Sequence, residues 1–239
     1  MPILECKGVT KYFGGLAAIS NVGFDVEAGE IVGVIGPNGA GKTTLFNLIS
    51  GALAPRSGVI TFKDRNITGL KPHQICRAGI ARTFQSVKIF SNMSVLDNVQ
   101  VGSLFGKPLG ISARDAGKNS EEALSFVGLD AVKTSLAKDL TLARQKQVEV
   151  ARALATKPEL LLLDELMAGL NAAEVAKAMQ MVTRIRQRGV TIVMIEHVMK
   201  AIMGMCDRII VLHHGEKIAE GTPREIAANK TVVEVYLGE

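Results

Sequence analysis

The chain has 239 residues, and its 28 Lys and Arg against 23 Asp and Glu give a net charge of +5. This length supports a buried core, either in one large domain or in a core with one inserted subdomain. With 47% hydrophobic and 21% charged residues, the composition excludes disordered, collagen-like and coiled-coil proteins. The apolar runs are of strand length, far below the roughly 20 residues that span a bilayer, and the opening Met1–Glu5 predicts no signal peptide.

The excess of basic residues does not by itself indicate nucleic-acid binding. Lys and Arg are scattered, aromatic residues make up 4% and Trp is absent, whereas nucleic-acid surfaces concentrate basic residues among aromatic ones. We therefore expect a solvated basic surface and no nucleic-acid partner, with an anionic partner or a membrane surface as the alternative. Cys6, Cys76 and Cys206 lack metal or disulfide spacing, which predicts reduced, buried thiols in a cytosolic protein.

The first sixty residues are typical of strands. Residues 3–9 and 19–26 alternate apolar and polar side chains, and a turn follows at 27–30. The continuous apolar run 31–35 indicates a strand that is covered on both faces, as in a parallel sheet. A helix over 44–50, ended by Gly51, and a strand over 58–62 come next.

Between the strand at 31–35 and that helix lies a pattern with a chemical meaning. It reads Gly36-Pro37-Asn38-Gly39-Ala40-Gly41-Lys42-Thr43 and fits G-x-x-x-x-G-K-[ST] without a mismatch. The glycines let backbone N–H groups converge on a polyphosphate at the positive end of the following helix. Lys42 is expected to reach the β- and γ-phosphates and the Thr43 hydroxyl to ligate Mg²⁺, with Thr44 completing the binding segment. The sequence thus predicts a nucleoside-triphosphate site.

The middle of the chain, from about 87 to 155, lacks strongly β-branched runs and favours helices, which predicts an inserted helical subdomain. Residues 102–120 are rich in Gly, Ser and Lys and are predicted to form a loop at its tip. After it come strands over 160–163, 191–195 and 208–212, with a helix opened by Asn171 and Glu174 and a short helix through Met203. The prediction is a single α/β domain over 1–239, with a mostly parallel sheet and an N-terminal antiparallel β subdomain.

Polar side chains follow the predicted strands at the sheet edge where ligands bind in open α/β folds. Asp164 and Glu165 follow the strand at 160–163; Asp164 is expected to hold Mg²⁺ and Glu165 to activate the attacking water. His197 follows the strand at 191–195, which suits a sensor of the γ-phosphate, although a lone His is more often structural. Gln85 follows the segment 80–84 and is only a candidate from the residues alone. His213 and His214 point to opposite sides of a strand and make a poor metal site.

These motifs occur in the order found in ABC-transporter ATPases, which the chain resembles over essentially its whole length. The segments 11–16, 81–85, 167–171 and 236–239 are most similar to the ATPase subunits of branched-chain amino-acid importers. The resemblance implies a P-loop NTPase core of the RecA-like type, ATP and Mg²⁺ as cofactors, and ATP hydrolysis coupled to transport.

The resemblance also implies roles for single residues. Phe13, or less favourably Tyr12, would stack on the adenine, and Gln85 would contact Mg²⁺ and the attacking water while coupling to the membrane subunits. Glu165 would be the catalytic base and His197 the γ-phosphate switch. Residues 168–171 would cross a dimer interface.

One segment departs from the family pattern. The signature L-S-G-G-Q aligns with Leu140-Thr141-Leu142-Ala143-Arg144, which keeps a hydroxyl but loses both glycines and the glutamine. Thr141 can still offer its hydroxyl to a γ-phosphate, and Arg144 adds a positive charge. In the family, two subunits bind ATP head to tail and each signature completes the partner's site, so we expect a heterodimer with a second ATPase, with a homodimer as the alternative.

The remaining partners follow from the same resemblance. They are integral-membrane permease subunits, contacted through the segment 87–95, and indirectly a periplasmic or extracellular binding protein, which places the chain peripherally on the cytoplasmic face of the membrane. Alternatives are ABC ATPases of urea uptake or of lipid and lipopolysaccharide export, and a non-transport ABC ATPase of DNA repair or chromosome organisation. A G protein is disfavoured because no N-K-x-D-type motif is present, and a small-molecule kinase because it would not need Glu165 beside Asp164 or a histidine after a strand.

Overall fold

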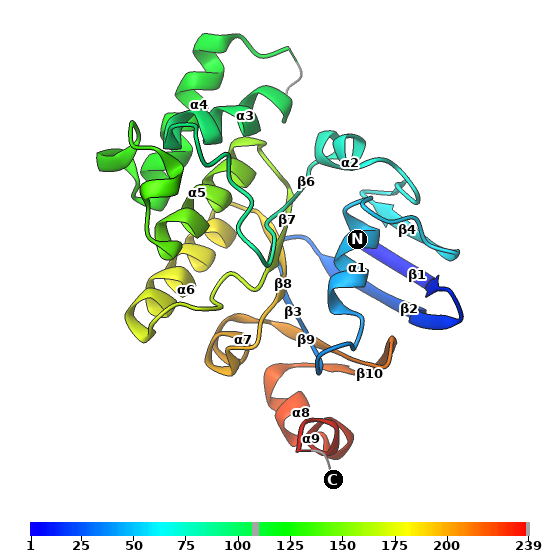
Figure 1. Ribbon diagram of the computed structural model, residues 1–239. Coiled ribbons are helices and arrows are strands. Elements are labelled where there is room, and N and C mark those ends of the chain that lie inside the picture. The colour runs from blue at the N-terminus through cyan, green and yellow to red at the C-terminus, as the bar shows by residue number, and fades with distance from the viewer. Residues whose placement is uncertain (107–109, 238–239) are drawn as a thin grey trace.

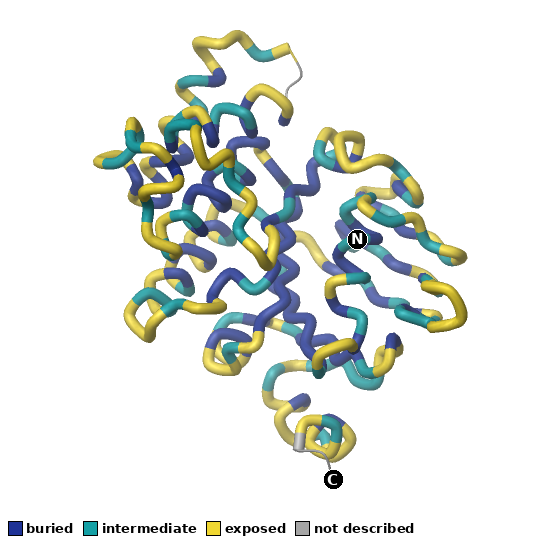
Figure 2. Tube along the Cα trace, viewed as in Figure 1, coloured by how far each residue is buried: buried dark blue, intermediate teal, exposed yellow. Residues whose placement is uncertain are grey.

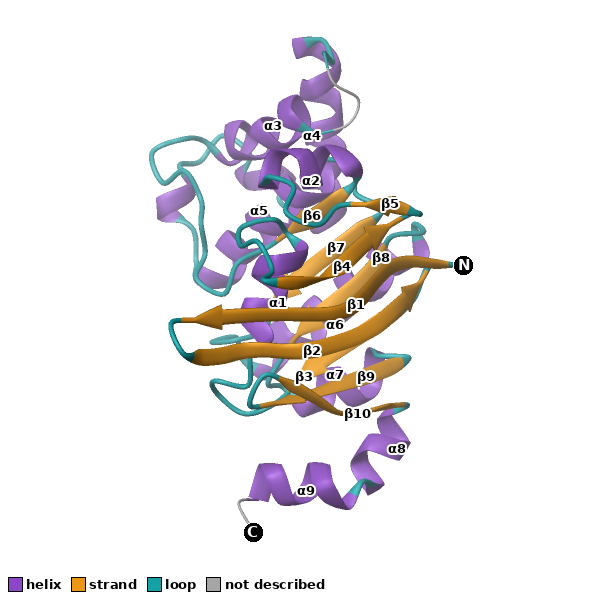
Figure 3. Ribbon diagram, turned by 90° about the vertical axis from the view of Figure 1, so that its right-hand side faces the viewer, coloured by secondary structure: helices purple, strands orange, loops and turns teal. Residues whose placement is uncertain are grey.

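In the computed structural model, which describes residues 1–106 and 110–237, two sheets face each other with a helix between them (Figures 1 and 3). The larger sheet has the order β10-β9-β3-β8-β7-β6, and the smaller, antiparallel sheet has the order β2-β1-β4-β5. The strands are β1 (Pro2–Phe13), β2 (Leu16–Glu27), β3 (Ile31–Ile35), β4 (Ser57–Phe62), β5 (Arg65–Asn66), β6 (Ile80–Arg82), β7 (Leu160–Asp164), β8 (Thr191–Ile195), β9 (Arg208–His213) and β10 (Glu216–Gly221). This α/β arrangement confirms the predicted fold class.

Helices lie on both faces of the larger sheet, whereas α8 and α9 extend beyond its β10 edge (Figure 1). They are α1 (Lys42–Ile49), α2 (Pro72–Ala78), α3 (Val95–Phe105), α4 (Ala113–Val127), α5 (Leu142–Ala155), α6 (Ala172–Gln187), α7 (Met199–Met205), α8 (Pro223–Ala228) and α9 (Lys230–Leu237), with 3₁₀ turns at Asp130–Val132 and Ala137–Asp139. Within residues 1–106 and 110–237, none of them combines the length and the apolar character needed to cross a lipid bilayer.

The central strands are the most buried part of the molecule (Figure 2). Every residue of β3, β7 and β8 is buried, and β3 pairs in parallel with β8 and β9 while β7 pairs in parallel with β6 and β8. Because parallel strands end at one edge, the residues after β3, β6, β7 and β8 are brought together there. One apolar cluster fills the space between the two sheets around α1, and another lies under α5 and α6.

The helices α3, α4 and α5 pack against one another beside the sheet. The prediction of a loop over 102–120 is therefore wrong for most of that segment. Helix α3 continues to Phe105 and α4 begins at Ala113; only 106–112 separates them, and 107–109 lie outside the described residues. The small residues that suggested a loop are used for close packing: the Ser103 and Ser120 hydroxyls are buried 2.9 Å apart, and Gly102 lies against the backbone of Arg152. Ser112 caps α4 by accepting from the Asp115 N–H.

Other differences are small. Helix α1 begins at Lys42, two residues earlier than predicted, so its first N–H groups belong to the phosphate loop. Strand β10 adds an antiparallel edge to the larger sheet that the sequence pattern did not predict. Cys6 and Cys206 are buried as expected, whereas Cys76 is half-buried.

Candidate nucleotide site

The phosphate loop runs from β3 to α1, and two of its glycines are fixed by close backbone contacts. Gly36 and Gly41 have φ of 151° and 103°, and a Cβ at either would overlap a carbonyl oxygen, of Leu212 and Ala18 respectively. The Gly215 N–H donates to the Ala40 carbonyl at 3.1 Å. Strand β2 and the turn between β9 and β10 therefore hold the loop in shape. Their contacts are so close that only glycine, which has no side chain, fits at Gly36 and Gly41.

Lys42 is buried and folds back on its own loop. Its Nζ donates to the carbonyl oxygens of Gly36 at 2.6 Å and Pro37 at 3.0 Å. Burial lowers the pKa of the Lys42 ammonium group, and the nearby Glu165 and Asp164 oppose that shift. The two carboxyl groups thus help to keep a positive charge at the start of α1, where an anion is also favoured by the helix dipole.

A cavity of about 430 Å³ lies over the loop and joins several of the predicted residues. Its walls are Leu16, Ala17, Ala18, Asn38, Gly39, Ala40, Gly41, Lys42, Thr43, Thr44, Gln85, Glu165 and His214. Sequence reasoning missed the first three and set His214 aside as a poor metal ligand. Among the described residues, those that line the cavity do not include Tyr12 or Phe13, which are half-exposed at the end of the hairpin of β1 and β2.

Asp164 is buried at the end of β7 and uses one carboxylate oxygen for an internal ion pair. Its Oδ2 accepts from the Arg82 guanidinium at 2.7 Å, and its backbone N–H donates to the Thr83 hydroxyl at 3.2 Å. Burial raises the pKa of the Asp164 carboxyl, and the hydrogen bond from Arg82 opposes this. In the described part of the chain, Asp164 Oδ1 is buried without a hydrogen-bond partner.

That oxygen is an observation in favour of a metal site. A buried carboxylate oxygen without a donor is costly unless a cation or a water satisfies it. Residues 1–106 and 110–237 contain no cluster of three or more His, Cys, Asp or Glu that could enclose a metal ion alone. Mg²⁺ is commonly held by one or two carboxylates together with phosphate oxygens and waters, so this donor set fits magnesium bound with a nucleotide.

Glu165 and His197 form a pair at the same sheet edge. His197 Nε2 lies 3.2 Å from Glu165 Oε1, and the His197 side chain is 46% exposed. Glu165 has a φ of 50°, a left-handed conformation that is uncommon for a residue with a side chain. Its backbone is held on both sides, since its N–H donates to the Ile195 carbonyl at 2.9 Å and its carbonyl accepts from Lys146 Nζ at 2.8 Å.

Glu196, which lies between β8 and His197, is a further buried residue that the sequence motifs do not single out. Its Oε1 accepts from the Met167 N–H at 2.8 Å, and only 2% of the residue is exposed. Burial raises the pKa of the Glu196 carboxyl to about 7, and Lys146 opposes the shift. Its position after β8 gives no signal of this role, because the Met167 partner lies 29 residues away in the sequence.

The signature segment lies apart from the phosphate loop. Thr141 is the N-cap of α5, and its hydroxyl accepts from the Arg144 N–H at 3.5 Å. Both residues are exposed and line a small hollow of about 180 Å³ beside α6. The structure thus does not join Thr141 and Arg144 to the cavity over the phosphate loop of the same chain.

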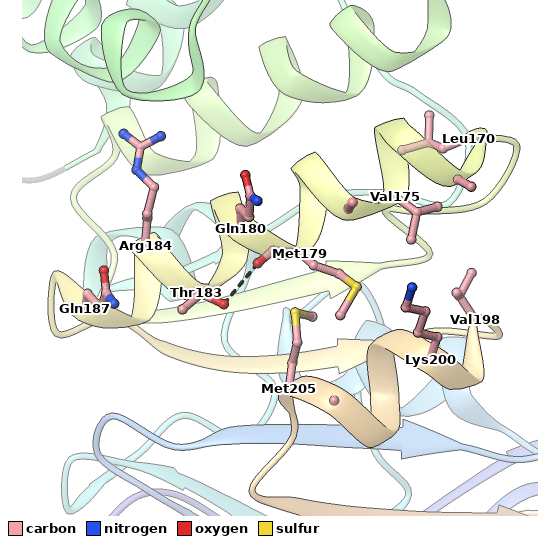
Figure 4. A pocket seen from close by; sticks show the side chains of 13 residues that line it. Leu170, Val175, Met179, Gln180, Thr183, Arg184, Gln187, Val198, Lys200 and Met205 are labelled. Carbon is pink, nitrogen blue, oxygen red and sulfur yellow. Dashed lines mark hydrogen bonds between the residues drawn. The ribbon is translucent and has the colours of Figure 1, made fainter.

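A larger hollow of about 860 Å³ lies between α6 and α7, where Met179 and Met205 extend toward each other (Figure 4). Its lining is mostly apolar and includes Arg184 and Lys200 but no carboxylate and no part of the phosphate loop. The cavity over the phosphate loop, with its amides, its hydroxyls, Lys42 and the single acid Glu165, is the one that matches a nucleotide chemically.

Comparison with known proteins agrees with this geometry. Residues 19–168 match the ABC transporter family, and residues 216–239 match the family of branched-chain amino acid ATP-binding cassette transporters. The chain is 40% identical to the high-affinity branched-chain amino acid transport ATP-binding protein LivG of Salmonella typhimurium (100% of this chain, 98% of that protein). It is 34% identical to the lipopolysaccharide export system ATP-binding protein LptB of Acidithiobacillus ferridurans (99% and 97%).

A solved structure is similar over the whole chain. The ADP conformation of MJ1267, an ATP-binding cassette of an ABC transporter, superposes with a TM-score of 0.90 at 30% identity and covers 100% of both chains. A dimeric cassette, MJ0796 bound to ADP and Pi, gives a TM-score of 0.83 at 27% identity (92% of this chain, 99% of that one). With its phosphate loop, its paired acids after β7 and these matches along its full length, the chain belongs to the ATP-hydrolysing, nucleotide-binding subunits of the ABC transporter family.

Proposed function

We propose that the chain drives a branched-chain amino-acid importer by hydrolysing ATP. The observation that carries this proposal is the joint match to LivG over nearly the full length of both proteins and to the branched-chain family at residues 216–239. Export of lipopolysaccharide is a second candidate, because LptB is similar over almost the same length at lower identity.

In this proposal the phosphate loop holds the triphosphate and the sheet edge holds the reacting water. Asn38 to Thr44 bind the phosphates, and Lys42 exchanges its two loop carbonyls for β- and γ-phosphate oxygens. Thr43, Gln85 and Asp164 hold Mg²⁺, which when bound neutralises charge that develops on the transferred phosphoryl group. Phe13, at the end of the hairpin of β1 and β2, is proposed to stack on the adenine.

Glu165 then acts as the general base, and His197 holds it in place. A water between Glu165 and the γ-phosphate gives up its proton to the carboxylate as its oxygen bonds to the γ-phosphorus, while the bond from that phosphorus to the bridging oxygen breaks and ADP leaves. The 3.2 Å contact with His197 Nε2 and the two backbone hydrogen bonds of Glu165 support this role, because they fix the carboxylate before the substrate arrives.

The second half of each site comes from a partner subunit. ATP binding closes a head-to-tail dimer and hydrolysis opens it; Thr141 and Arg144 of this chain complete the partner's site. Their exposure and their distance from the chain's own cavity support a role across the interface. Since this signature departs from the family pattern, we favour a heterodimer with a second ATPase whose signature completes the site of this chain.

The permease subunits are proposed to dock beside Gln85. A groove of about 690 Å³ lies there between α2 and β6 on one side and α3 and α5 on the other. Its walls include Phe84, Phe90 and Phe105, which are 36%, 47% and 65% exposed. Exposed aromatic side chains around a groove are typical of a protein interface, and docking there would hold the chain on the cytoplasmic face of the membrane, with a binding protein acting on the other side.

The test uses the complete transporter in its own cells. Cells that lack the chain are complemented with the wild type, with Lys42→Ala or with Lys118→Ala, an exposed lysine on α4, and uptake of labelled leucine is measured. We expect uptake with the wild type and Lys118→Ala and none with Lys42→Ala. Normal leucine uptake without the chain, together with loss of lipopolysaccharide from the cell surface, would contradict the importer and support the export system.

A further inference from the structure

Arg82 links Asp164 to the helix that follows the phosphate loop. It is the last residue of β6, and its side chain is 7% exposed. One terminal nitrogen donates to Asp164 Oδ2 at 2.7 Å. The other donates to Asn47 Oδ1 at 2.6 Å and to the Ser50 hydroxyl at 3.2 Å, both at the C-terminal end of α1. A planar guanidinium offers these donors in a fixed fork, so the three acceptors also fix one another.

Two aromatic rings restrict the guanidinium further. Its central carbon lies 5.7 Å from the centre of the Phe46 ring and 5.1 Å from that of Phe84, distances at which a cation is attracted to a ring. Phe46 belongs to α1, and Phe84 directly precedes Gln85. Arg82 also lines the groove beside Gln85, so it contacts the metal-site acid on one side and this groove on the other.

The hydrogen bond from Arg82 makes the two carboxylate oxygens of Asp164 different from each other. Arg82 takes Oδ2, so the carboxylate cannot rotate freely and Oδ1 stays in place without a donor. Because its remaining oxygen is already fixed, the carboxylate need not reorient when it accepts a hydrogen bond from a magnesium-bound water. In metal sites generally, hydrogen bonds that orient a metal ligand raise the affinity for the metal. Without Arg82, neither oxygen of the buried Asp164 carboxylate would have a hydrogen-bond partner in residues 1–106 and 110–237.

We propose that Arg82 is a positioning residue for magnesium, which orients Asp164 so that nucleotide binds more tightly with Mg²⁺ than without it. This inference rests on the proposed role of Asp164 as a metal-holding acid. The alternative is that the ion pair only ties β6 to β7, in which case its loss would weaken nucleotide binding equally with and without the metal.

The experiment measures ATPγS binding to the full chain by calorimetry, once with Mg²⁺ and once with EDTA. The variants are Arg82→Lys, which keeps the charge but loses the fork, and Arg77→Lys as the control, an exposed arginine on α2. For Arg82→Lys we expect the affinity gained from Mg²⁺ to fall by about 10-fold or more, as is typical for partners of metal ligands, with the EDTA value unchanged. Arg77→Lys is expected to match the wild type.

The inference would be overturned if Mg²⁺ raised the ATPγS affinity of Arg82→Lys as much as that of the wild type. It would also be overturned if Arg82→Lys lost the same factor of affinity with Mg²⁺ and with EDTA. If Arg82→Lys fails to fold, Asn47→Ala replaces it; this variant removes one acceptor of the fork, and the same selective loss at smaller size is expected. Asp164→Asn tests the proposed metal role of Asp164 separately from the positioning role of Arg82. If it keeps the gain from Mg²⁺, the proposed metal role of Asp164 is wrong, whereas loss in Asp164→Asn together with retention in Arg82→Lys rejects the role of Arg82 alone.

Discussion

At the scale of single residues, two buried ionisable side chains hold the backbone of the turn after β7. Lys146 donates to the Glu165 carbonyl, and Glu196 accepts from the Met167 N–H, so both sides of the turn after β7 are held by buried ionisable side chains. Each of the two is at most 5% exposed. Such groups cost free energy when charged in the interior, and a measurable dependence of stability on pH follows.

We expect Glu196 to make the folded state less stable as the pH rises toward neutrality. Burial raises the pKa of its carboxyl from 4.5 to about 7, with Lys146 and Glu165 as the charged groups that act on it. The stabilisation is thus complete below about pH 4.5 and is lost as the pH rises through 7, an effect on the order of 3 kcal/mol for a shift of this size. In Glu196→Gln this loss is absent, so the melting temperature of the variant relative to wild type should increase from pH 5 to pH 8.

Thermal unfolding at several pH values measures this difference. Glu122→Gln, on an exposed position of α4, serves as the control because its carboxyl is solvated. A difference between Glu196→Gln and wild type that stays constant over the whole pH range would show that Glu196 does not titrate with folding.

At the scale of elements, the helices beside the sheet depend on small residues at close contacts. Gly102 of α3 approaches α5 so closely that a Cβ would overlap the Arg152 carbonyl oxygen. Gly117 of α4 is also within a helix but has no atom within 4 Å of such a Cβ. The two glycines therefore predict opposite effects of the same substitution.

Gly102→Ala should destabilise the protein by about 1–3 kcal/mol, because α3 must move away from α5. Gly117→Ala should stabilise it by about 0.5–1 kcal/mol, because alanine favours a helix and no neighbour is disturbed. Chemical unfolding of the two variants beside the wild type gives both numbers. Similar effects of the two substitutions would contradict the close packing of α3 on α5.

Local sequence patterns predicted the segments whose backbone conformation or chemistry requires particular residue types, such as the phosphate loop and a helix cap. The phosphate loop follows from Gly36 to Thr43 because the pattern itself describes the chemistry, and the cap of α6 follows from Asn171 and Glu174, whose reciprocal hydrogen bonds are present. The helices around 102–120 could not be predicted, because glycine and serine favour loops locally and only the contact with α5 explains them. The roles of Arg82 and Glu196 could not be predicted for a similar reason: their hydrogen-bond partners lie far away in sequence, and spacing carries no signal for them.

At the scale of the whole molecule, the cavity over the phosphate loop is only half of the site that we propose. The cavity contains Lys42 and Glu165 of this chain, whereas Thr141 and Arg144 face a different hollow beside α6. In a head-to-tail pair with a second ATPase, the two sites would thus be unequal. The partner's signature would complete the site that contains the base Glu165. The signature of this chain, which differs from the family pattern, would complete the other site.

We therefore expect unequal effects of the same substitution in the two subunits. Glu165→Gln in this chain should lower ATP turnover of the assembled pair by about 100-fold or more, since it removes the general base from the complete site. The equivalent change in the partner should have a much smaller effect. Steady-state ATP hydrolysis of each singly substituted pair tests this, and equal losses would count against the asymmetry.

Lys42 adds one more consequence through its hydrogen bonds to Gly36 and Pro37. Its ammonium group donates to these two loop carbonyls, so a ligand that binds Lys42 must replace them as acceptors. Neutral carbonyls are weaker acceptors than anionic oxygens, and a compound gains from this exchange only by bringing negative charge. If Lys42 binds phosphate oxygens as proposed, we expect affinity among adenine compounds to rise with the number of phosphate groups, and adenosine, which has no anionic oxygen, to gain nothing from this exchange.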